Sequence, residues 1–361
     1  MKTTHGCPVI TSLIMVSLLF PLFSMAQIKD SSVAGLPKVE LHHHLDCSLS
    51  YAVVKQLDPT VTYEAWRRDF VAPAKCMDLA DYISRAIKAV NLMQTEEQLR
   101  LVTLDVIRQL KHDQVIYAEI RFAPLLHLQQ GLTPAQVVKT VNDAVTEGMR
   151  ETGIEVGVIL CTLRHYSADQ SMQTVQLVER FKGTHIVGFD IAADEAGFPI
   201  TNHIASFDYA HQKGIPCTAH AGEAKGASSV WETLQYFKPS RIGHGVRSTE
   251  DEALMRHLKK EGIHLEVCLT SNIQTAIYDR LENHTVNKIY ASGVSMSINT
   301  DARTISDVTL SSEYTLLEQL FGWKKDRFLR CNLEAIDHAF TNEATKEKIR
   351  QQLKAAYSPS S

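Results

Sequence analysis

Short apolar runs alternate with longer amphipathic stretches along most of the chain. Eight of these runs have the length and composition of buried β-strands. They are expected at Lys38–Asp46, Val115–Ala123, Ile154–Arg164, Ile186–Ala193, Ile215–Ala221, Arg241–Gly245, His264–Thr270 and Val294–Thr300. Helical periodicity separates most of them, for example in Pro134–Glu151 and Thr249–Glu261. This order predicts an α/β fold, a (β/α)8 barrel of parallel strands.

The connection between the first two predicted strands is unusually long. It covers Cys47–Gln114 and contains helical patterns at Leu79–Met93 and Glu96–Leu110. We therefore expect a helical insertion after the first strand, on the barrel end where active sites form. It would act as a substrate cover, as a stabilising subdomain, or as both. A doubly wound open sheet is the alternative fold, but the Gly-rich turn that usually follows its first strand is missing.

The first 26 residues have the features of a secretory signal peptide. Lys2 supplies a positive charge, Val9–Phe23 is an uncharged and mostly apolar run, and Ser24–Ala26 matches a cleavage site. A membrane anchor is the alternative, but the run is short for a bilayer span and contains Pro21. We expect export to the periplasm or medium, and a single mature domain over residues 27–361 without membrane association.

Composition limits the classes of protein that the chain can represent. The chain has 361 residues, 44% of them hydrophobic, and a net charge of -4. These values exclude intrinsic disorder and disfavour binding to nucleic acid polymers. Seven cysteines are present, one of them (Cys7) in the predicted leader. The others are widely spaced and lack a CxxC pair, so we expect buried thiols rather than disulfides.

The first predicted strand carries polar residues where a barrel interior normally holds Val, Ile or Leu. Side chains alternate along a strand, so His42, His44 and Asp46 share one face and His43 points away. Two imidazoles and a carboxylate are costly to bury unless they are paired or bind a metal. We interpret His42 and His44 as metal ligands, against the alternative of histidines that are exposed or hydrogen-bonded.

Three later strands, the fifth, sixth and eighth, also end in or are followed by ionisable residues. His220 lies at the end of the fifth strand, and Asp301 directly follows the eighth. Strand ends of a barrel converge on one mouth, and imidazole with carboxylate ligands suits Zn²⁺ with one exchangeable position. The ligands inferred for this ion are His42, His44, His220 and Asp301.

Glu223 and His244 complete the predicted site, just beyond the fifth strand and at the end of the sixth. A metal lowers the pKa of a coordinated water toward 7 and so favours hydrolysis at neutral pH. Glu223 is a candidate proton donor, if burial raises its pKa, and His244 orients the water or helps to deprotonate it. These residues predict metal-assisted hydrolysis without identifying the bond that is cleaved.

The assembled segments resemble the adenosine deaminase family of the amidohydrolase superfamily. The matching segments, in chain order, are Leu36–Asp46, Arg121–Pro124, Thr218–Glu223, Arg241–Gly245 and Ser297–Asp301. No single segment is specific, but their order spans nearly the whole predicted mature chain.

The resemblance implies hydrolytic removal of the 6-amino group from a small purine nucleoside, with one zinc ion per chain. Adenosine or deoxyadenosine would give inosine or deoxyinosine and ammonia. Activated water would attack purine C6 while Glu223 protonates N1 and His244 positions the water. Asp301 would also accept a hydrogen bond from that water. The residues implied to bind substrate are His44, Asp46 near the ribose and the backbone of Ala193.

Three positions depart from the family pattern. Ala193 replaces a common Gly, and its methyl group narrows the approach of the substrate. Ala302 replaces a second acid that would hold purine N7, and losing such a charge-assisted bond costs about 1.5–3 kcal/mol. Cys47 also stands where Gly is usual. Unless Arg303 or a water compensates, an alternative is a deaminase of adenine, 5'-modified adenosine or aminodeoxyfutalosine.

Other protein classes fit the sequence less well. Amidohydrolases with two metals often bridge them through a Lys on strand four, and Ile186–Ala193 contains none. Exported binding proteins with growth-factor roles carry an added N-terminal domain, whereas the short Gln27–Leu36 segment precedes strand one here. Cytidine and tRNA-adenosine deaminases carry a Pro-Cys-x-x-Cys element that is missing here, so editing of polynucleotides is not supported.

Overall fold

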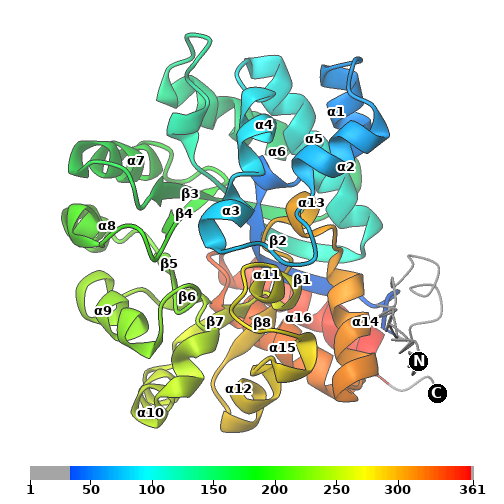
Figure 1. The fold of residues 1–361 in the computed structure, drawn as a ribbon, viewed down its shortest axis with the longest axis vertical. Coiled ribbons are helices and arrows are strands. Elements are labelled where there is room, and N and C mark those ends of the chain that lie inside the picture. Colours follow the sequence, from blue (N-terminus) through cyan, green and yellow to red (C-terminus); the bar gives the residue numbers. More distant parts are fainter. Residues whose placement is uncertain (1–32, 359–361) are drawn as a thin grey trace, which may run out of the picture.

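A computed structural model describes residues 33–358 and shows a parallel β-barrel surrounded by helices (Figure 1). The strands are β1 (Lys38–His44), β2 (Val115–Phe122), β3 (Glu155–Leu163), β4 (Ile186–Ala192), β5 (Thr218–Ala221), β6 (Arg241–His244), β7 (His264–Val267) and β8 (Met296–Ile298). The signal peptide predicted at residues 1–26 lies outside the described residues. Within residues 33–358, no helix combines the length and apolar character that crossing a membrane requires.

Two half-sheets close into the barrel. Strands β1 to β4 pair in sequence order, as do β5 to β8, and all pairs are parallel. Single bridges join the half-sheets between Phe189 and Cys217 and between His43 and Asp301. Parallel strands in unbroken sequence order, closed on themselves, confirm the predicted (β/α)8 fold.

Helices cover the outside of the barrel because each buries an apolar stripe. In α6 (Pro134–Thr152), for example, Val137, Val141 and Val145 are buried at a spacing of four residues. Thr133 caps its first turn, and Gly153 ends it at a φ of 75°. The other covering helices are α5 (Glu96–His112), α7 (Ala168–Arg180), α8 (Ile204–Gln212), α9 (Ala227–Phe237), α10 (Glu252–Glu261), α12 (Val286–Ser292), α14 (Leu310–Phe321), α15 (Lys325–His338) and α16 (Glu343–Tyr357).

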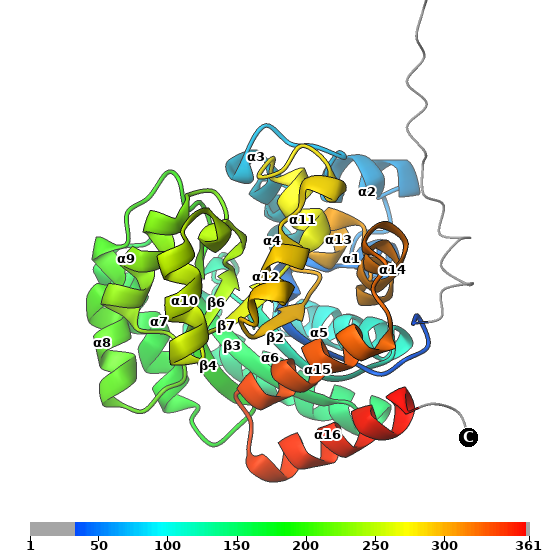
Figure 2. The same ribbon diagram turned by 90° about the horizontal axis from the view of Figure 1, so that it is seen from below.

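The long first connection forms four short helices before α5. They are α1 (Tyr51–Leu57), α2 (Tyr63–Phe70), α3 (Leu79–Ile83) and α4 (Ala86–Asn91). They gather with α11 (Leu269–Gln274) and α13 (Arg303–Ser306) at one end of the barrel, opposite α16 (Figure 2). The predicted helical insertion is therefore confirmed, and it lies at the end where the site is expected.

Some predicted element boundaries were wrong. Leu79–Met93 is not one helix, because the Ser84 hydroxyl donates to the Asp81 carbonyl at 2.6 Å and disturbs the regular pattern there. The predicted seventh strand continues only to Val267, and its last two residues begin α11 instead. A short apolar run suits either structure, so the sequence pattern did not separate them.

The first strand also ends earlier than predicted. It stops at His44, and Asp46 lies in a 3-10 turn over Leu45–Cys47. The alternation argument therefore holds for His42 and His44 but not for Asp46, which reaches the same cavity from the turn. The six cysteines of the described region are free thiols, five of them buried, as predicted.

Candidate active site

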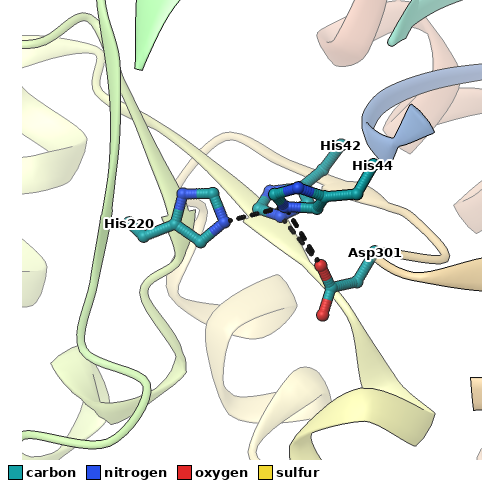
Figure 3. Close-up of side chains that lie close together, drawn as sticks. All are labelled: His42, His44, His220 and Asp301. Atoms are coloured by element: carbon teal, nitrogen blue, oxygen red, sulfur yellow. Dashed lines mark hydrogen bonds and ion pairs between the residues drawn. The ribbon is translucent and has the colours of Figure 1, made fainter. Parts of the chain in front are cut away.

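Three histidines and one aspartate converge at the barrel mouth (Figure 3). Asp301 Oδ1 lies 3.3 Å from His42 Nε2 and 3.4 Å from His44 Nε2. The Nε2 atoms of His44 and His220 are 3.2 Å apart. One ligand atom of each residue lies within 4.8 Å of the others. The structure thus brings together the four residues predicted as metal ligands.

Buried carboxylates orient two of these imidazoles. Glu266 Oε2 lies 2.8 Å from His42 Nδ1, and Asp190 Oδ1 lies 3.2 Å from His220 Nδ1. The carboxylates accept the Nδ1 hydrogens, so the Nε2 lone pairs face the cluster. His42 Nε2 is buried and has no hydrogen-bond partner. Such lone pairs together with one carboxylate fit a divalent cation that prefers nitrogen and oxygen ligands.

A chain of buried ion pairs holds these carboxylates inside the barrel. Arg121 lies 2.9 Å from Asp190 and 2.8 Å from Glu266, and Arg241 lies 2.7 Å from Glu266. Although burial opposes the effect, His220 and Arg121 lower the pKa of Asp190 below its usual range. Both acids therefore remain ionised in the interior. We did not predict these roles, although charged residues inside apolar strands were a signal for them.

Glu223 lies beside the cluster with its carboxyl group turned into the site. Its Oε2 is 3.5 Å from His244 Nε2, whereas its Oε1 is buried without a hydrogen-bond partner. Burial raises the pKa of Glu223 well above its usual value, and the charges of Asp301 and Glu195 raise it further. Both effects favour the protonated form of the carboxyl group, which a proton donor requires.

The loop that carries Glu223 is held by a second buried acid, Glu195. Its carboxylate accepts the backbone N–H groups of Gly222, Glu223 and Lys225 at 2.8 to 3.0 Å. It also accepts the Ser229 hydroxyl at 2.5 Å. These four bonds fix the backbone from which Glu223 projects. We predicted no role for Glu195, although its position just after the fourth strand could have indicated one.

Helix α11 supports the other side of the site. The Ser271 hydroxyl donates to Asp301 Oδ2 at 2.7 Å, and Asn272 Nδ2 lies 3.0 Å from His244 Nδ1. Both residues were missed, because the segment before them was predicted to be a strand.

The backbone is strained at three site residues. Ala193, His244 and Asp301 have φ values of 79°, 60° and 64°. Each left-handed conformation costs a non-glycine residue about 1–2 kcal/mol. Residues retained in such conformations cluster at functional sites, where the surrounding fold holds them in place. One predicted catalytic residue, one predicted metal ligand and one predicted substrate-binding residue therefore have strained backbones.

The cluster opens into a cavity of about 330 Å³ below the helical insertion. Its polar end contains three of the four ligand residues, His44, His220 and Asp301, together with Asp46, Glu223 and His244, and Ala193 also lines it. Its opposite walls are largely apolar and include Leu79, Ile83 and Leu163. The described lining contains neither Lys nor Arg. Burial raises the pKa of Asp46 to about 6, and its Oδ2 accepts the Ala123 N–H at 3.3 Å.

The residues of the cavity and of the metal-ligand cluster all lie within a segment that matches a known protein family. Residues 37–356 match the family model described as adenosine deaminase. The chain belongs to the adenosine deaminase family. This family is metal-dependent, which agrees with the cluster of histidines and aspartate.

Similar proteins cover nearly the whole chain. An adenosine deaminase from Enterococcus faecalis is 34% identical over 335 residues, which cover 91% of this chain and 99% of the relative. An adenine deaminase from Arthrobacter aurescens has the same fold, with a TM-score of 0.82, 23% identity and coverage of 89% and 98%. A zinc-bound amidohydrolase from Burkholderia ambifaria also has a TM-score of 0.82, with 20% identity and coverage of 89% and 90%.

This adenosine deaminase family member has an apolar wall where a second acid was expected. Ala302 lines the cavity and is buried in an apolar cluster with Leu79, Tyr82 and Ile305. Arg303 does not take the place of the acid, because its Nη1 pairs with Asp113 Oδ2 at 3.1 Å and it does not line this cavity. The departure at position 302 is therefore not compensated by the neighbouring arginine.

Proposed function

We propose that this protein hydrolytically deaminates adenosine and deoxyadenosine to inosine and deoxyinosine, with release of ammonia. It would thus be a hydrolase acting on the carbon–nitrogen bond of a cyclic amidine. One observation carries the proposal: Glu223, whose Oε1 is buried without a hydrogen-bond partner, lines the same cavity as His44, His220 and Asp301 of the cluster. The relatives that cover most of this chain support it.

The donor set supports one Zn²⁺ per chain. His42, His44, His220 and Asp301 would hold it, and they supply nitrogen and oxygen ligands without thiolate. A bound zinc ion would supply a water with a pKa lowered toward 7. Asp301 Oδ2 is already engaged by Ser271, so Oδ1, which faces His42 and His44, is the oxygen available to the ion.

The remaining groups act directly on the substrate and the attacking water. Glu223 would donate its proton to purine N1, which makes C6 more electrophilic. His244 would orient the water that attacks C6, from the side facing Glu223. After attack, one proton of the attacking water passes to the 6-amino group, which leaves as ammonia. The other replaces the proton that Glu223 gave to N1, and the ring is left as a 6-oxopurine. Both residues with these roles, Glu223 and His244, line the cavity.

The lining of the cavity favours a nucleoside over a nucleotide. A 5'-phosphate carries nearly two negative charges, and the described lining offers no Lys or Arg to balance them. Asp46 adds a carboxyl group that suits ribose hydroxyls and repels phosphate. Ala193 lines the same cavity, and its backbone N–H would donate to a ring nitrogen. Free adenine would leave Asp46 without its ribose partner.

A second candidate is a deaminase of another 6-aminopurine, and Ala302 is the observation that favours it. Its methyl group belongs to an apolar wall, so the purine would lose a polar contact there. A 5'-modified adenosine with an apolar substituent would offset this loss of binding energy. Its substituent would pack against Leu79 and Ile83 in the same cavity.

Initial-rate measurements with purified zinc-loaded protein test the proposal. Adenosine, deoxyadenosine, adenine, 5'-modified adenosines and AMP are compared at equal enzyme concentration. We expect the highest kcat/KM with adenosine or deoxyadenosine and negligible turnover of AMP. Equal or faster turnover of adenine or a 5'-modified nucleoside would replace the proposal by the second candidate, and no turnover of any 6-aminopurine would refute both.

Two variants sharpen this comparison. Ala302→Asp should raise kcat/KM for adenosine about 10- to 150-fold, if the added acid gains the 1.5–3 kcal/mol of a charge-assisted bond. Asp46→Ala should lower kcat/KM for adenosine while leaving any activity on adenine unchanged.

We also propose that the protein is exported. The support is the sequence of residues 1–26, with Lys2 before the apolar run Val9–Phe23. Mass spectrometry of protein from the medium or periplasm should find a mature N-terminus at Gln27. A cell-associated protein that retains Met1 would refute this part of the proposal.

A further inference from the structure

A line of hydrogen bonds connects the backbone of α12 with the catalytic imidazole. The Val286 N–H donates to His284 Nδ1 at 3.1 Å, and His284 Nε2 lies 3.2 Å from Asn272 Oδ1. Asn272 Nδ2 in turn lies 3.0 Å from His244 Nδ1. The three side chains are at most 4% exposed, so water does not replace these contacts.

The direction of the line is set at its backbone end. A backbone N–H only donates, so His284 Nδ1 must be the acceptor. Burial lowers the pKa of His284 to about 3, so this imidazole is neutral and carries its single hydrogen on Nε2. That hydrogen is donated to Asn272 Oδ1, which turns the amide NH2 group toward His244.

We propose that His284 and Asn272 are positioning residues that fix the hydrogen of His244 on Nε2. Because Asn272 donates to it, His244 Nδ1 is an acceptor and carries no hydrogen. A neutral imidazole then has its hydrogen on Nε2, the nitrogen that faces Glu223 at 3.5 Å. The mechanistic meaning of this assignment rests on the proposed deamination, in which His244 faces the attacking water.

This arrangement distinguishes between the two roles considered for His244. With a hydrogen on Nε2 and Nδ1 occupied by Asn272, the ring has no free lone pair in the cavity and cannot take a proton from water there. It donates a hydrogen bond instead, which orients the attacking oxygen and stabilises its developing charge. The Nε2 hydrogen also faces Oε2 of Glu223, which leaves the unpartnered Oε1 to carry the acidic proton.

Asn272→Asp reverses the direction of the hydrogen bond between residue 272 and His244 Nδ1, with almost no change in the shape of the side chain. A carboxylate only accepts hydrogen bonds. It therefore favours the tautomer of His244 that carries its hydrogen on Nδ1 and none on Nε2. We expect kcat to fall about 10²- to 10⁴-fold, the usual contribution of a correctly protonated group. Zinc content and melting temperature, measured in parallel, should stay close to those of the wild type.

Substitutions at His284 separate positioning from simple packing. His284→Leu removes the donor that orients Asn272, and His284→Gln keeps an N–H that can reach Asn272 Oδ1. We expect a loss of kcat in the first variant and substantial rescue in the second, with little change in KM. His264→Gln, which alters another buried imidazole at β7, is the matched control and should keep wild-type kcat.

A double-mutant cycle tests whether His284 acts through His244. In a His244→Asn background, His284→Leu should reduce kcat no further, because the ring that it orients is gone. Losses that multiply in the double variant would assign His284 a merely structural role and overturn the proposal.

The tautomer is also observable without any substrate. Nitrogen NMR of protein labelled at histidine, with the His244 signals identified by their loss in His244→Asn, should show hydrogen on Nε2 only. Hydrogen on Nδ1, or on both nitrogens, would overturn the proposal. This readout is unaffected if adenosine is not the substrate, whereas the wild-type rates alone decide the proposed function.

Discussion

Glu223 combines burial, a raised pKa and one unpartnered oxygen, so its proton is available to the substrate. Glu223→Gln keeps the shape of the side chain and the backbone bonds to Glu195 but removes the acid. We expect kcat to fall about 10²- to 10⁴-fold. Adenosine turnover and zinc content measured on the same sample check this, and the zinc content should not change. The exposed Glu261→Gln is the matched control. A loss smaller than tenfold would assign the proton donor elsewhere.

Glu313 is a second buried acid, behind the site rather than in it. Burial, with a smaller contribution from the charge of Glu40, raises its pKa from 4.5 to about 7, although the Thr270 N–H donates to Oε2 at 3.3 Å. Its pKa in the unfolded chain is lower, so the folded protein loses stability as the pH rises from about 5 to about 8. A shift of this size corresponds to about 3 kcal/mol.

Glu313→Gln should remove this pH dependence. The variant should exceed the wild type in free energy of unfolding at about pH 8, and the two should converge near pH 5. Urea unfolding at both pH values measures the difference. If the free energy of unfolding of the wild type is lower than that of the variant by the same amount at both pH values, Glu313 is not protonated in the folded state.

At the scale of elements, the insertion is attached to the barrel mouth by a few specific bonds. Tyr82 on α3 shares a hydrogen bond of 2.6 Å with Ser306 on α13. The Ala72 N–H also donates to Ile305 O, and the Cys76 N–H donates to Gln274 O, both at 2.8 Å. These contacts hold the apolar wall of the cavity over the ligand cluster.

Tyr82→Phe tests the contribution of this attachment. The phenyl ring keeps the apolar wall, but the bond to Ser306 is lost, at a net cost of about 1 kcal/mol. We expect KM for adenosine to rise about fivefold with little change in kcat. Steady-state kinetics measure both, with the exposed Tyr63→Phe on α2 as control. A fall in kcat at constant KM would mean that the bond serves catalysis and not substrate binding.

The helices and strands also differ in how well the sequence predicts them. The predicted starts of β1, β2, β4, β6 and β7 match the structure, because short segments containing Val, Ile or Leu mark these strands. The histidines that gather at the barrel mouth were also singled out from the sequence, since imidazoles inside apolar strands are unusual. Asn272 and Glu195 were not assigned roles, because their partners, His244 and the Glu223 loop, lie far away in sequence. Hydrogen bonds of this kind exist only after the barrel has closed.

At the scale of the whole molecule, the metal ligands join the two half-sheets. His42 and His44 belong to β1, whereas His220 belongs to β5 and Asp301 follows β8. A bound metal therefore stabilises the folded barrel as a unit. A metal present at 100 times its Kd adds about 2.7 kcal/mol.

Removal of the metal should therefore lower the melting temperature of the whole protein. A chelator should lower it by several degrees, and added zinc should restore it. His220→Ala should melt lower from the start and respond less to the chelator. Melting that is independent of the chelator, in protein shown to have lost its metal, would contradict a bridging role.

The seam between the first and last strands has a consequence for how the protein is made. Backbone bonds join His44 N to Asp301 O at 2.7 Å and Asp301 N to His42 O at 3.0 Å. Two ligands are thus translated near the beginning of the chain, and their partner emerges from the ribosome only near the end. A chain that ends before Asp301 lacks the fourth ligand, so it cannot form the complete metal site.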